Sequence, residues 1–492
     1  MRNRAAKLLF VISALACHAL AQSALPEPGA PRPFVVPNLV ESKIANGLKV
    51  AVVQRKNVPL VTVRLLIPTG AKAETIEKAG LADLTAALAA KRTRTRTADQ
   101  IAEQMEFLGG ALVSGADWNS TFFSFTVTND KLGAAMAILA DVILNSTSDA
   151  KELELLRAQT LDNLAADLKQ PTFLANFVAS RYAFDEHPPG GTPDSIKNLT
   201  RTDIVAFRRQ NYLPDSSVAI FTGDVDPVRA KSLTAQYLGA WRSPKREVVE
   251  RNLRTVRSEE PDYGAPRILV VDLPDSGQSS VSYVKRINVD GRVRCTSDIR
   301  CDSSPIFFPA AVMNSVLGGG YSSRLNQEIR IKRGLSYGAG SSFAWRLSSV
   351  NFITRTQTKD ESAAEVAELV MNEINRISGE TVPADELAAR KLVINGDYSR
   401  EFETTAELAE TVSAIYVYRL RPAEMTTFVS QINGTDAASV LSFAKKQIMN
   451  GDFVIAGDFG KFRDDLIKRF PRAKVTVIES GKLDISKPGL QK

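Results

Sequence analysis

Cysteine and histidine often carry metal or redox chemistry, and both are scarce in this chain. The sequence has three cysteines, and five residues separate Cys295 from Cys301 in a polar stretch. In an oxidising, exported compartment that spacing suggests a disulfide that clamps a loop. A two-thiol metal site is the weaker alternative, because no histidine or third cysteine lies nearby. Only two histidines are present, and only His187 lies beyond the first 21 residues.

The N-terminus has the pattern of a secretory signal peptide. A basic start precedes the mostly apolar run from Leu8 to Ala16, and Ala19-Leu20-Ala21 fits a cleavage site. We therefore expect an exported protein, periplasmic or secreted. A buried N-terminal helix and lipid attachment at Cys17 are the less favoured alternatives. No later segment approaches 18 apolar residues, so the sequence predicts no transmembrane segment in the mature chain.

Length and composition are those of an ordinary globular protein. The chain has 492 residues, of which 44% are hydrophobic and 24% charged, enough for two or more domains with large cores. The formal net charge is +7, and part of this excess lies in the basic N-terminal segment. No Lys/Arg block is interleaved with aromatic residues, so nucleic-acid binding is not expected.

The apolar pattern predicts strands and helices in a similar order in two halves. In the first half we expect strands at 48–53, 60–67, 120–127 and 218–221 and helices near 80–90, 98–108, 130–144 and 149–168. In the second half we expect strands at 268–273, 279–286, 337–345 and 349–357 and helices near 306–317 and 361–377. The predicted segments are a signal peptide (1–21), a Pro-rich lead-in (22–37), a first domain (38–242), a charged linker (243–265), a second domain (266–480) and a tail (481–492).

Two pairs of local motifs recur at one spacing. Glu386 opens a long helix 234 residues after Glu152 does, and the strand-ending pair Gly457-Asp458 follows Gly223-Asp224 by the same 234 residues. A single repeated spacing in the same local context indicates two copies of one domain. Helices that alternate with pairs of strands predict an α+β protein. Each of its two homologous domains would have a mainly antiparallel sheet with helices packed on one face.

Three stretches of the sequence form a combined pattern: residues 80–87, the glycine-rich run 317–325, and the run from Arg330 to Tyr337, which reads Arg-x-x-x-Gly-Leu-x-Tyr. Together they resemble the pitrilysin/insulinase (inverzincin) family of zinc metallopeptidases. In that family the first stretch is the helix that carries H-x-x-E-H, the second is the glycine-rich loop, and the third is the Arg/Tyr signature. The resemblance extends from about 38 to 480. It implies an active site between two similar halves, in which one half brings zinc and a glutamate and the other brings an arginine and a tyrosine.

The metal-binding positions depart from the family pattern. An inverzincin helix needs histidines at i and i+4 and a glutamate at i+3. Asp83 and Ala87 stand where the histidines would be, and Ala86 where the glutamate would be. Asn163 is the best match for the third ligand, a glutamate in the family. Since His187 cannot build a two-histidine site alone, we expect no metal or other cofactor on this chain, and zinc only on a partner.

The remaining motif residues have roles that the resemblance implies. Arg330 and Tyr337 would contact the substrate carbonyl and the developing oxyanion, with Arg330 at the end of a helix and Tyr337 on the next strand. Gly318, Gly319 and Gly320 would form a flexible loop at the substrate. Without the resemblance, Arg330 is a solvated charge and Tyr337 a half-buried strand aromatic. The glycines would then be a helix C-cap followed by a loop, although three exceed what a cap needs.

Two functions of different class follow from this pattern. Some relatives divide the work between two chains, as mitochondrial processing peptidase does. The first hypothesis is a non-zinc subunit of an exported heterodimeric metallopeptidase, which supplies Arg330 and Tyr337 in trans to a homologous zinc-binding partner for peptide hydrolysis. No activity is expected from the chain alone. The alternative is a non-enzymatic scaffold or peptide-binding protein of the same fold. The presence of Arg330, Gly334 and Tyr337 beside a lost zinc site favours the first.

Overall fold

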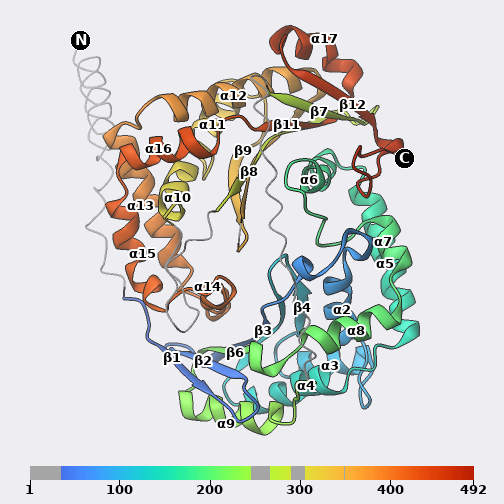
Figure 1. The fold of residues 1–492 in the computed structure, drawn as a ribbon. Helices are drawn as coiled ribbons and strands as arrows, with labels where there is room; N and C mark the ends of the chain where they lie inside the picture. Colours follow the sequence, from blue (N-terminus) through green and yellow to red (C-terminus); the bar gives the residue numbers. More distant parts are fainter. Residues whose placement is uncertain (1–34, 245–265, 290–304, 348, 492) are drawn as a thin grey trace, which may run out of the picture. The chain divides into compact units, whose positions relative to one another are not determined.

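The computed structural model describes residues 35–244, 266–289, 305–347 and 349–491 (Figure 1). The predicted signal peptide, most of the predicted lead-in, the predicted linker from residue 245 and the stretch with Cys295 and Cys301 lie outside the described residues. Within the described ranges, no helix is long and apolar enough to cross a membrane.

The first half is built on a six-stranded mixed sheet in the order β1-β2-β6-β3-β5-β4. Its strands are β1 (Leu39–Lys43), β2 (Lys49–Gln54), β3 (Leu60–Ile67), β4 (Val113–Ala116), β5 (Thr121–Thr128) and β6 (Val218–Gly223). Only β2 and β6 run parallel, and the other neighbours are antiparallel. The helices are α2 (Leu81–Ala89), α3 (Ala98–Phe107), α4 (Leu132–Asn145), α5 (Ala150–Asp167), α6 (Pro171–Tyr182), α7 (Pro193–Asn198), α8 (Arg201–Asn211) and α9 (Pro227–Leu238), with short 3-10 turns η1 (Ala71–Ala73), η2 (Ile76–Lys78) and η3 (Pro214–Ser216).

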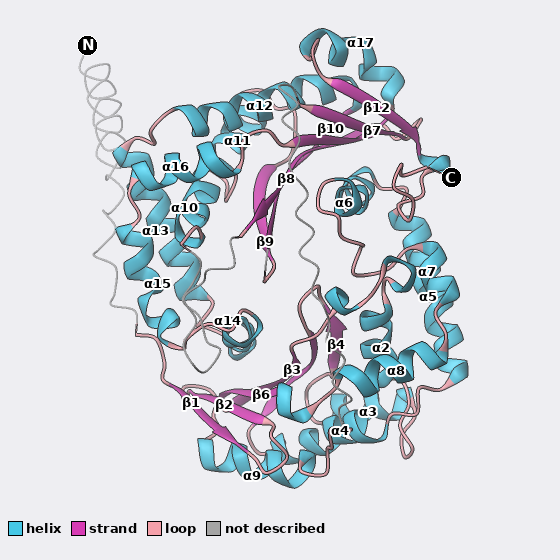
Figure 2. Ribbon diagram, viewed as in Figure 1, coloured by secondary structure: helices cyan, strands magenta, loops and turns pink. Residues whose placement is uncertain are grey.

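The second half repeats this plan, a six-stranded sheet with helices packed against it (Figure 2). Its strands lie in the order β12-β7-β11-β8-β10-β9. Its strands are β7 (Arg267–Asp272), β8 (Gln278–Asn288), β9 (Ala339–Trp345), β10 (Ser349–Lys359), β11 (Asp452–Gly457) and β12 (Lys474–Glu479). The helices are α10 (Phe307–Leu317), α11 (Arg324–Asn326), the π-helical turn η4 (Gln327–Ile331), α12 (Ala363–Gly379), α13 (Ala384–Arg400), α14 (Thr405–Val417), α15 (Ala423–Gly434), α16 (Ala437–Gln447) and α17 (Phe459–Arg469), with 3-10 turns η5 (Asp360–Ser362) and η6 (Ser480–Lys482). The predicted fold class, two α+β domains that each combine a sheet with helices, is confirmed.

The duplicated Gly-Asp pairs end β6 and β11, as predicted, and both glycines are required by close packing. Gly223 has φ +120°, and a Cβ there would lie 2.0 Å from the Leu60 carbonyl oxygen. A Cβ at Gly457 would lie 1.9 Å from Ser279 Oγ. Any side chain at either position would overlap the neighbouring strand, so glycine is needed at the same point of both sheets.

Each half packs its main hydrophobic core between one sheet face and its own helices. In the first half, Val63, Leu65 and Phe125 are buried with residues of α2 and α4. In the second half, Tyr283 and Phe352 are buried with residues of α10 and α12. Burial of large apolar side chains of this kind is the dominant favourable contribution to folding.

The opposite face of each sheet is covered by a helix from the other half. α6 packs on β8 and β11, where Leu174 and Val178 join a third core with Val454 (Figure 1). α14 packs on β3 and β6, where Thr405 Oγ1 lies 2.7 Å from Thr62 Oγ1. Both helices begin at the same point of the repeat, 234 residues apart. The two halves therefore exchange one helix each, which adds a second helical layer to the predicted arrangement.

The C-terminal segment also joins the core around α6. Ile485 and Leu490, from the residues predicted as a tail, are 3% and 5% exposed and belong to the same cluster as Leu174. This segment is therefore packed against the second sheet.

Candidate functional site

Arg330 lies near the end of a helix, as predicted, in the π-helical turn η4. The amide of Lys332 donates to the carbonyl of Gln327 at 3.0 Å, which is the wider spacing of a π-turn. Single π-turns within helices are rare and frequently occur at functional sites. The guanidinium carbon of Arg330 lies 5.0 Å from the ring centre of Tyr321, within the range of a cation–π contact.

The other basic residues of this segment are neutralised by carboxylates. Lys332 and Arg333 both pair with Glu328, and Arg333 Nη1 lies 2.7 Å from its Oε2. Arg324 makes two hydrogen bonds to Glu386, at 2.9 and 2.7 Å. Among the residues that the structure describes, no carboxylate pairs with Arg330. Its N–H groups are therefore available to an external acceptor.

Tyr337 does not lie on a strand, which corrects our prediction. Ser336 Oγ donates to the carbonyl of Gly338 at 2.7 Å and accepts the amide of Gly338 at 3.1 Å. This side-chain bond closes a turn, so β9 begins only at Ala339. Tyr337 stands at the tip of the turn and is 94% exposed.

The turn that carries Tyr337 is fixed on its N-terminal side as well. The carbonyl of Leu335 accepts a hydrogen bond from Thr358 Oγ1, a buried side chain of β10, at 2.6 Å. The backbone is thus bonded before and within the turn, while the phenol projects from it. Tyr337 is an exposed aromatic residue on an ordered support.

The glycine run has packing reasons of its own. A Cβ at Gly318 would lie 2.3 Å from the amide nitrogen of Ser341 in β9, and one at Gly319 would lie 2.8 Å from the Cα of Ser315. Gly320 has φ +142°, a backbone conformation that side chains rarely adopt. The excess of glycine over a simple cap is therefore explained by close packing at Gly318 and Gly319 and by the backbone conformation at Gly320. The flexible loop at the substrate stays a prediction.

The helix that resembles the zinc-binding segment is α2, and its motif positions make structural contacts. Asp83 Oδ1 accepts the backbone amide of Ala116, in the edge strand β4, at 3.1 Å. Burial raises the pKa of the Asp83 carboxyl above its ordinary value. Ala86 is fully buried, and its carbonyl accepts a hydrogen bond from Ser114 Oγ at 3.2 Å.

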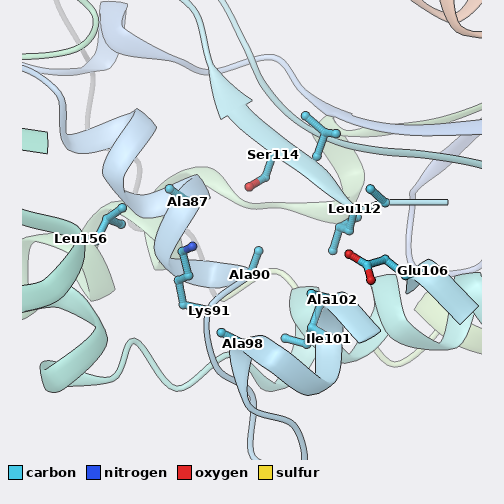
Figure 3. Close-up of a pocket in the computed structure, with 12 residues that line it drawn as sticks. Ala87, Ala90, Lys91, Ala98, Ile101, Ala102, Glu106, Leu112, Ser114 and Leu156 are labelled. Atoms are coloured by element: carbon cyan, nitrogen blue, oxygen red, sulfur yellow. The ribbon is translucent and has the colours of Figure 1, made fainter. Parts of the chain in front are cut away.

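Ala87 faces a cavity of about 430 Å³ between α2, α3, β4 and α5 (Figure 3). Lys91, Glu106 and Leu156 also line this cavity, whereas Asn163 is an exposed residue of α5. Of the four motif positions only Asp83 offers a carboxylate, and that group is bonded to β4. The donor set therefore does not fit zinc. In the described part of the chain, no three His, Cys, Asp or Glu side chains are grouped so that they could hold a metal ion.

His187 belongs to a buried cluster that no sequence pattern predicted. The residue is 6% exposed, its Nδ1 lies 3.7 Å from Glu74 Oε2, and its ring lies 5.1 Å from that of Trp118. Burial lowers the pKa of His187 below its ordinary value. Glu74 accepts the amides of Gly80, at 2.9 Å, and of Ala82, so it caps the start of α2. Burial raises the pKa of Glu74 to about 8.

An ion pair beside this cluster links the segment after α6 to the second sheet. Arg346 Nε and Nη2 donate to the two carboxylate oxygens of Glu186 at 3.1 and 2.9 Å, and Asn351 Nδ2 donates to Glu186 at 2.9 Å. The Arg346 guanidinium also lies 5.1 Å from the ring centre of Trp118. This bidentate pair is largely buried and joins residues that are 160 positions apart.

Comparison with known proteins gives similarity over most of the chain. Residues 49–184 match the family model described as insulinase (peptidase family M16), and residues 198–393 match the one described as the peptidase M16 inactive domain. Together the two models match more than half of the chain. An uncharacterised zinc protease of Mycobacterium leprae is 26% identical over 362 residues, which are 72% of this chain and 76% of that protein.

Solved structures share the fold. A peptidase M16 inactive domain from Pseudomonas fluorescens superposes with a TM-score of 0.73 at 23% identity, over 85% of this chain and 98% of that one. The periplasmic protease PqqL from Escherichia coli superposes with a TM-score of 0.67 at 15% identity. That match covers 91% of this chain and 52% of PqqL.

Proposed function

This chain belongs to peptidase family M16, and from that premise we propose that it is the non-zinc subunit of an exported heterodimeric metallopeptidase. The observation that carries the proposal is the state of Arg330 and Tyr337. Arg330 has no ion pair among the described residues, and Tyr337 is exposed on a bonded turn. The metal positions of α2, by contrast, offer no ligand set. The chain thus retains donors and lacks the metal ligands.

In this function Arg330 and Tyr337 would donate to a peptide carbonyl as negative charge develops on its oxygen. Donors that are fixed before the reaction stabilise such charge effectively, and removing one typically costs about 10²–10³ in rate. Hydrolysis itself would require a homologous partner with an intact zinc helix. We propose zinc for that partner, and a peptide as the substrate shared by the two chains.

Export is the second part of the proposal. The N-terminal pattern of a signal peptide supports it, and so does the fold shared with a periplasmic protease. In an oxidising compartment, Cys295 and Cys301 could form the disulfide that their spacing suggests.

A peptide-binding protein without catalysis is the second candidate, and β4 favours it. This strand is the edge of the first sheet, and Val113 and Ser114 from it line the cavity beside α2. An edge strand can accept an extended peptide as an additional strand. Such binding would need neither Arg330 nor Tyr337.

The test is turnover by the complex with an exported homologue that has an intact zinc helix. We expect Arg330→Ala or Tyr337→Phe, or both, to lower turnover about 10²-fold at matched assembly, with folding and partner binding nearly unchanged. Arg333→Ala is the matched control, because Arg333 lies in the same segment but pairs with Glu328. Unchanged turnover in both variants would refute the role in trans and favour the binding protein.

A further inference from the structure

We propose that Tyr321 and Asn326 are positioning residues that hold Arg330 and Tyr337 in a fixed relation to each other. The inference rests on the proposed function, because it concerns the same two donors. The side chains of Arg330 and Tyr337 have few contacts of their own, so other residues must orient them.

Asn326 is bonded to the loops on both sides of the pair. It is 3% exposed, and its Nδ2 donates to the carbonyl of Tyr321 at 2.5 Å. Its Oδ1 accepts the amide of Ala339 at 3.3 Å. Tyr321 directly follows the glycine run, and Ala339 is the second residue after Tyr337. The buried amide side chain of Asn326 therefore connects the loop that carries Tyr321, the ring next to Arg330, to the end of the turn that carries Tyr337.

The ring of Tyr321 contacts the guanidinium of Arg330. Its side chain is 64% exposed, so core packing does not account for an aromatic residue here. The Arg330 guanidinium lies 5.0 Å from the ring centre, and no carboxylate within the described residues competes for it. A ring contacts the face of a guanidinium and leaves the N–H groups at its edge free to donate. This cation–π contact with Tyr321 would thus restrain Arg330 without occupying its donors, whereas a salt bridge would occupy them.

The surrounding bonds make the support rigid. Ser323 is fully buried, and both its amide and its Oγ donate to the carbonyl of Gly320, at 3.1 and 2.6 Å. The amide of Ser341 donates to the carbonyl of Gly318 at 3.2 Å. The loop is therefore tied to β9 before Tyr321 and to α11 after it. Donors held in this way need little rearrangement when charge develops, which is the condition for efficient stabilisation.

The test compares substitutions at Tyr321 in the assembled complex, with a peptide that wild-type complex cleaves. Tyr321→Leu removes the ring, and we expect kcat to fall about tenfold with KM nearly unchanged, because misplaced donors weaken only the transition state. Tyr321→Phe keeps the ring face, so we expect kcat close to wild type. A role in general stability would not separate these two variants, since neither side chain is buried.

Asn326 is tested in the chain alone. In Asn326→Ala we expect faster amide hydrogen exchange in residues 318–323 and 335–340 together, while exchange in α2 stays unchanged as an internal control. Because Asn326 is buried, thermal unfolding must first show that this variant is folded. If it is not, the Tyr321 pair still decides the proposal.

The variants distinguish the positioning role of Tyr321 from the proposed role of Arg330 in trans. If Arg330→Ala slows the complex but Tyr321→Leu does not, the positioning role is wrong and the proposed function stands. If Arg330→Ala leaves turnover unchanged, the proposed function is wrong and the positioning role falls with it. Equal decreases of kcat in Tyr321→Leu and Tyr321→Phe would also overturn the inference, because they would assign the effect to the hydroxyl group and not to the ring.

Discussion

Glu74→Gln should change how the stability of this protein depends on pH. The Glu74 side chain is fully buried and accepts two backbone amides at the start of α2. Its pKa is raised to about 8 from an ordinary value of 4.5; burial is the largest cause, the two amides oppose it, and the nearby Asp83 adds to it. The native chain therefore binds a proton at the Glu74 carboxyl more tightly than the unfolded chain does.

The direction of this pH dependence follows from the linkage between proton binding and folding. A group whose folded pKa lies above its unfolded value contributes stability at low pH that is lost as the pH rises through the folded value. One pKa unit corresponds to 1.36 kcal/mol. Since about one unit separates pH 7 from the folded pKa of Glu74, wild-type protein should lose about 1–1.5 kcal/mol between pH 7 and pH 9 relative to Glu74→Gln.

The measurement is the free energy of unfolding by urea for both proteins at pH 7 and pH 9. His187, whose pKa is lowered, has the opposite sign, but its contribution changes only below its ordinary value of 6.5, so the chosen range avoids it. Glutamine also loses one of the two acceptor oxygens, which should cost roughly 1–3 kcal/mol at every pH. The decisive quantity is therefore the change with pH. If the free energies of unfolding of wild type and Glu74→Gln differ by the same amount at pH 7 and pH 9, the raised pKa of Glu74 is refuted.

Three further predictions concern other parts of the chain. Arg346→Met should destabilise the fold by about 3–5 kcal/mol in urea unfolding, because it removes the cation that pairs with the buried Glu186 carboxylate. The double variant with Glu186→Gln should recover part of that loss, and additive effects of the two substitutions would contradict the coupling. The purified chain should hold no stoichiometric zinc and hydrolyse no unfolded peptide; elemental analysis that finds about one tightly held zinc per chain, lost in Asp83→Ala, would contradict this. Cys295 and Cys301 should be disulfide-bonded in exported protein, with at most about 2–2.5 kcal/mol of stabilisation from so small a ring; mass spectrometry that detects two free thiols would count against both the bond and the export.

The elements that were predicted well have local determinants. Asp149 accepts the amides of Lys151 and Glu152, so the start of α5 is set by a side chain next to it. The predicted strand 218–221 and helix 98–108 match β6 and α3 to within about two residues. The duplication was visible because it preserves glycines that close packing requires. Signals of this kind lie within a few residues of the element that they specify.

The helix exchange depends on contacts that no local pattern reveals. In α6, Leu174, Phe177 and Val178 mark an apolar helix, but they do not specify which sheet it covers. The partners of α6 lie about 100 residues or more away in the sequence, in β8 and β11. The pairs Glu74–His187 and Glu186–Arg346 are likewise separated by more than 100 residues. Their geometry arises only when segments that are distant in the sequence come together in the folded chain.

At the site, the motif predicted where Arg330 lies but not how Tyr337 is presented. We predicted a strand from 337 to 345. The Ser336 side chain nevertheless bonds Gly338 and delays β9. A side chain that bonds its own backbone two residues away competes directly with the sheet ladder. An exposed Tyr337 on a turn is consistent with a donor that acts on another molecule.

The contacts of α2 explain how this helix remains stable without metal ligands. In the position of the first ligand, Asp83 caps the Ala116 amide of an edge strand that would otherwise be open. In the position of the base, Ala86 is fully buried in the core, where a glutamate side chain would be costly. Restoring histidines and a glutamate at Asp83, Ala86 and Ala87 would therefore remove the strand cap and overfill the core. We expect such a chain to be less stable than wild type in urea unfolding before any metal is added, and equal or greater stability would show that these contacts contribute little.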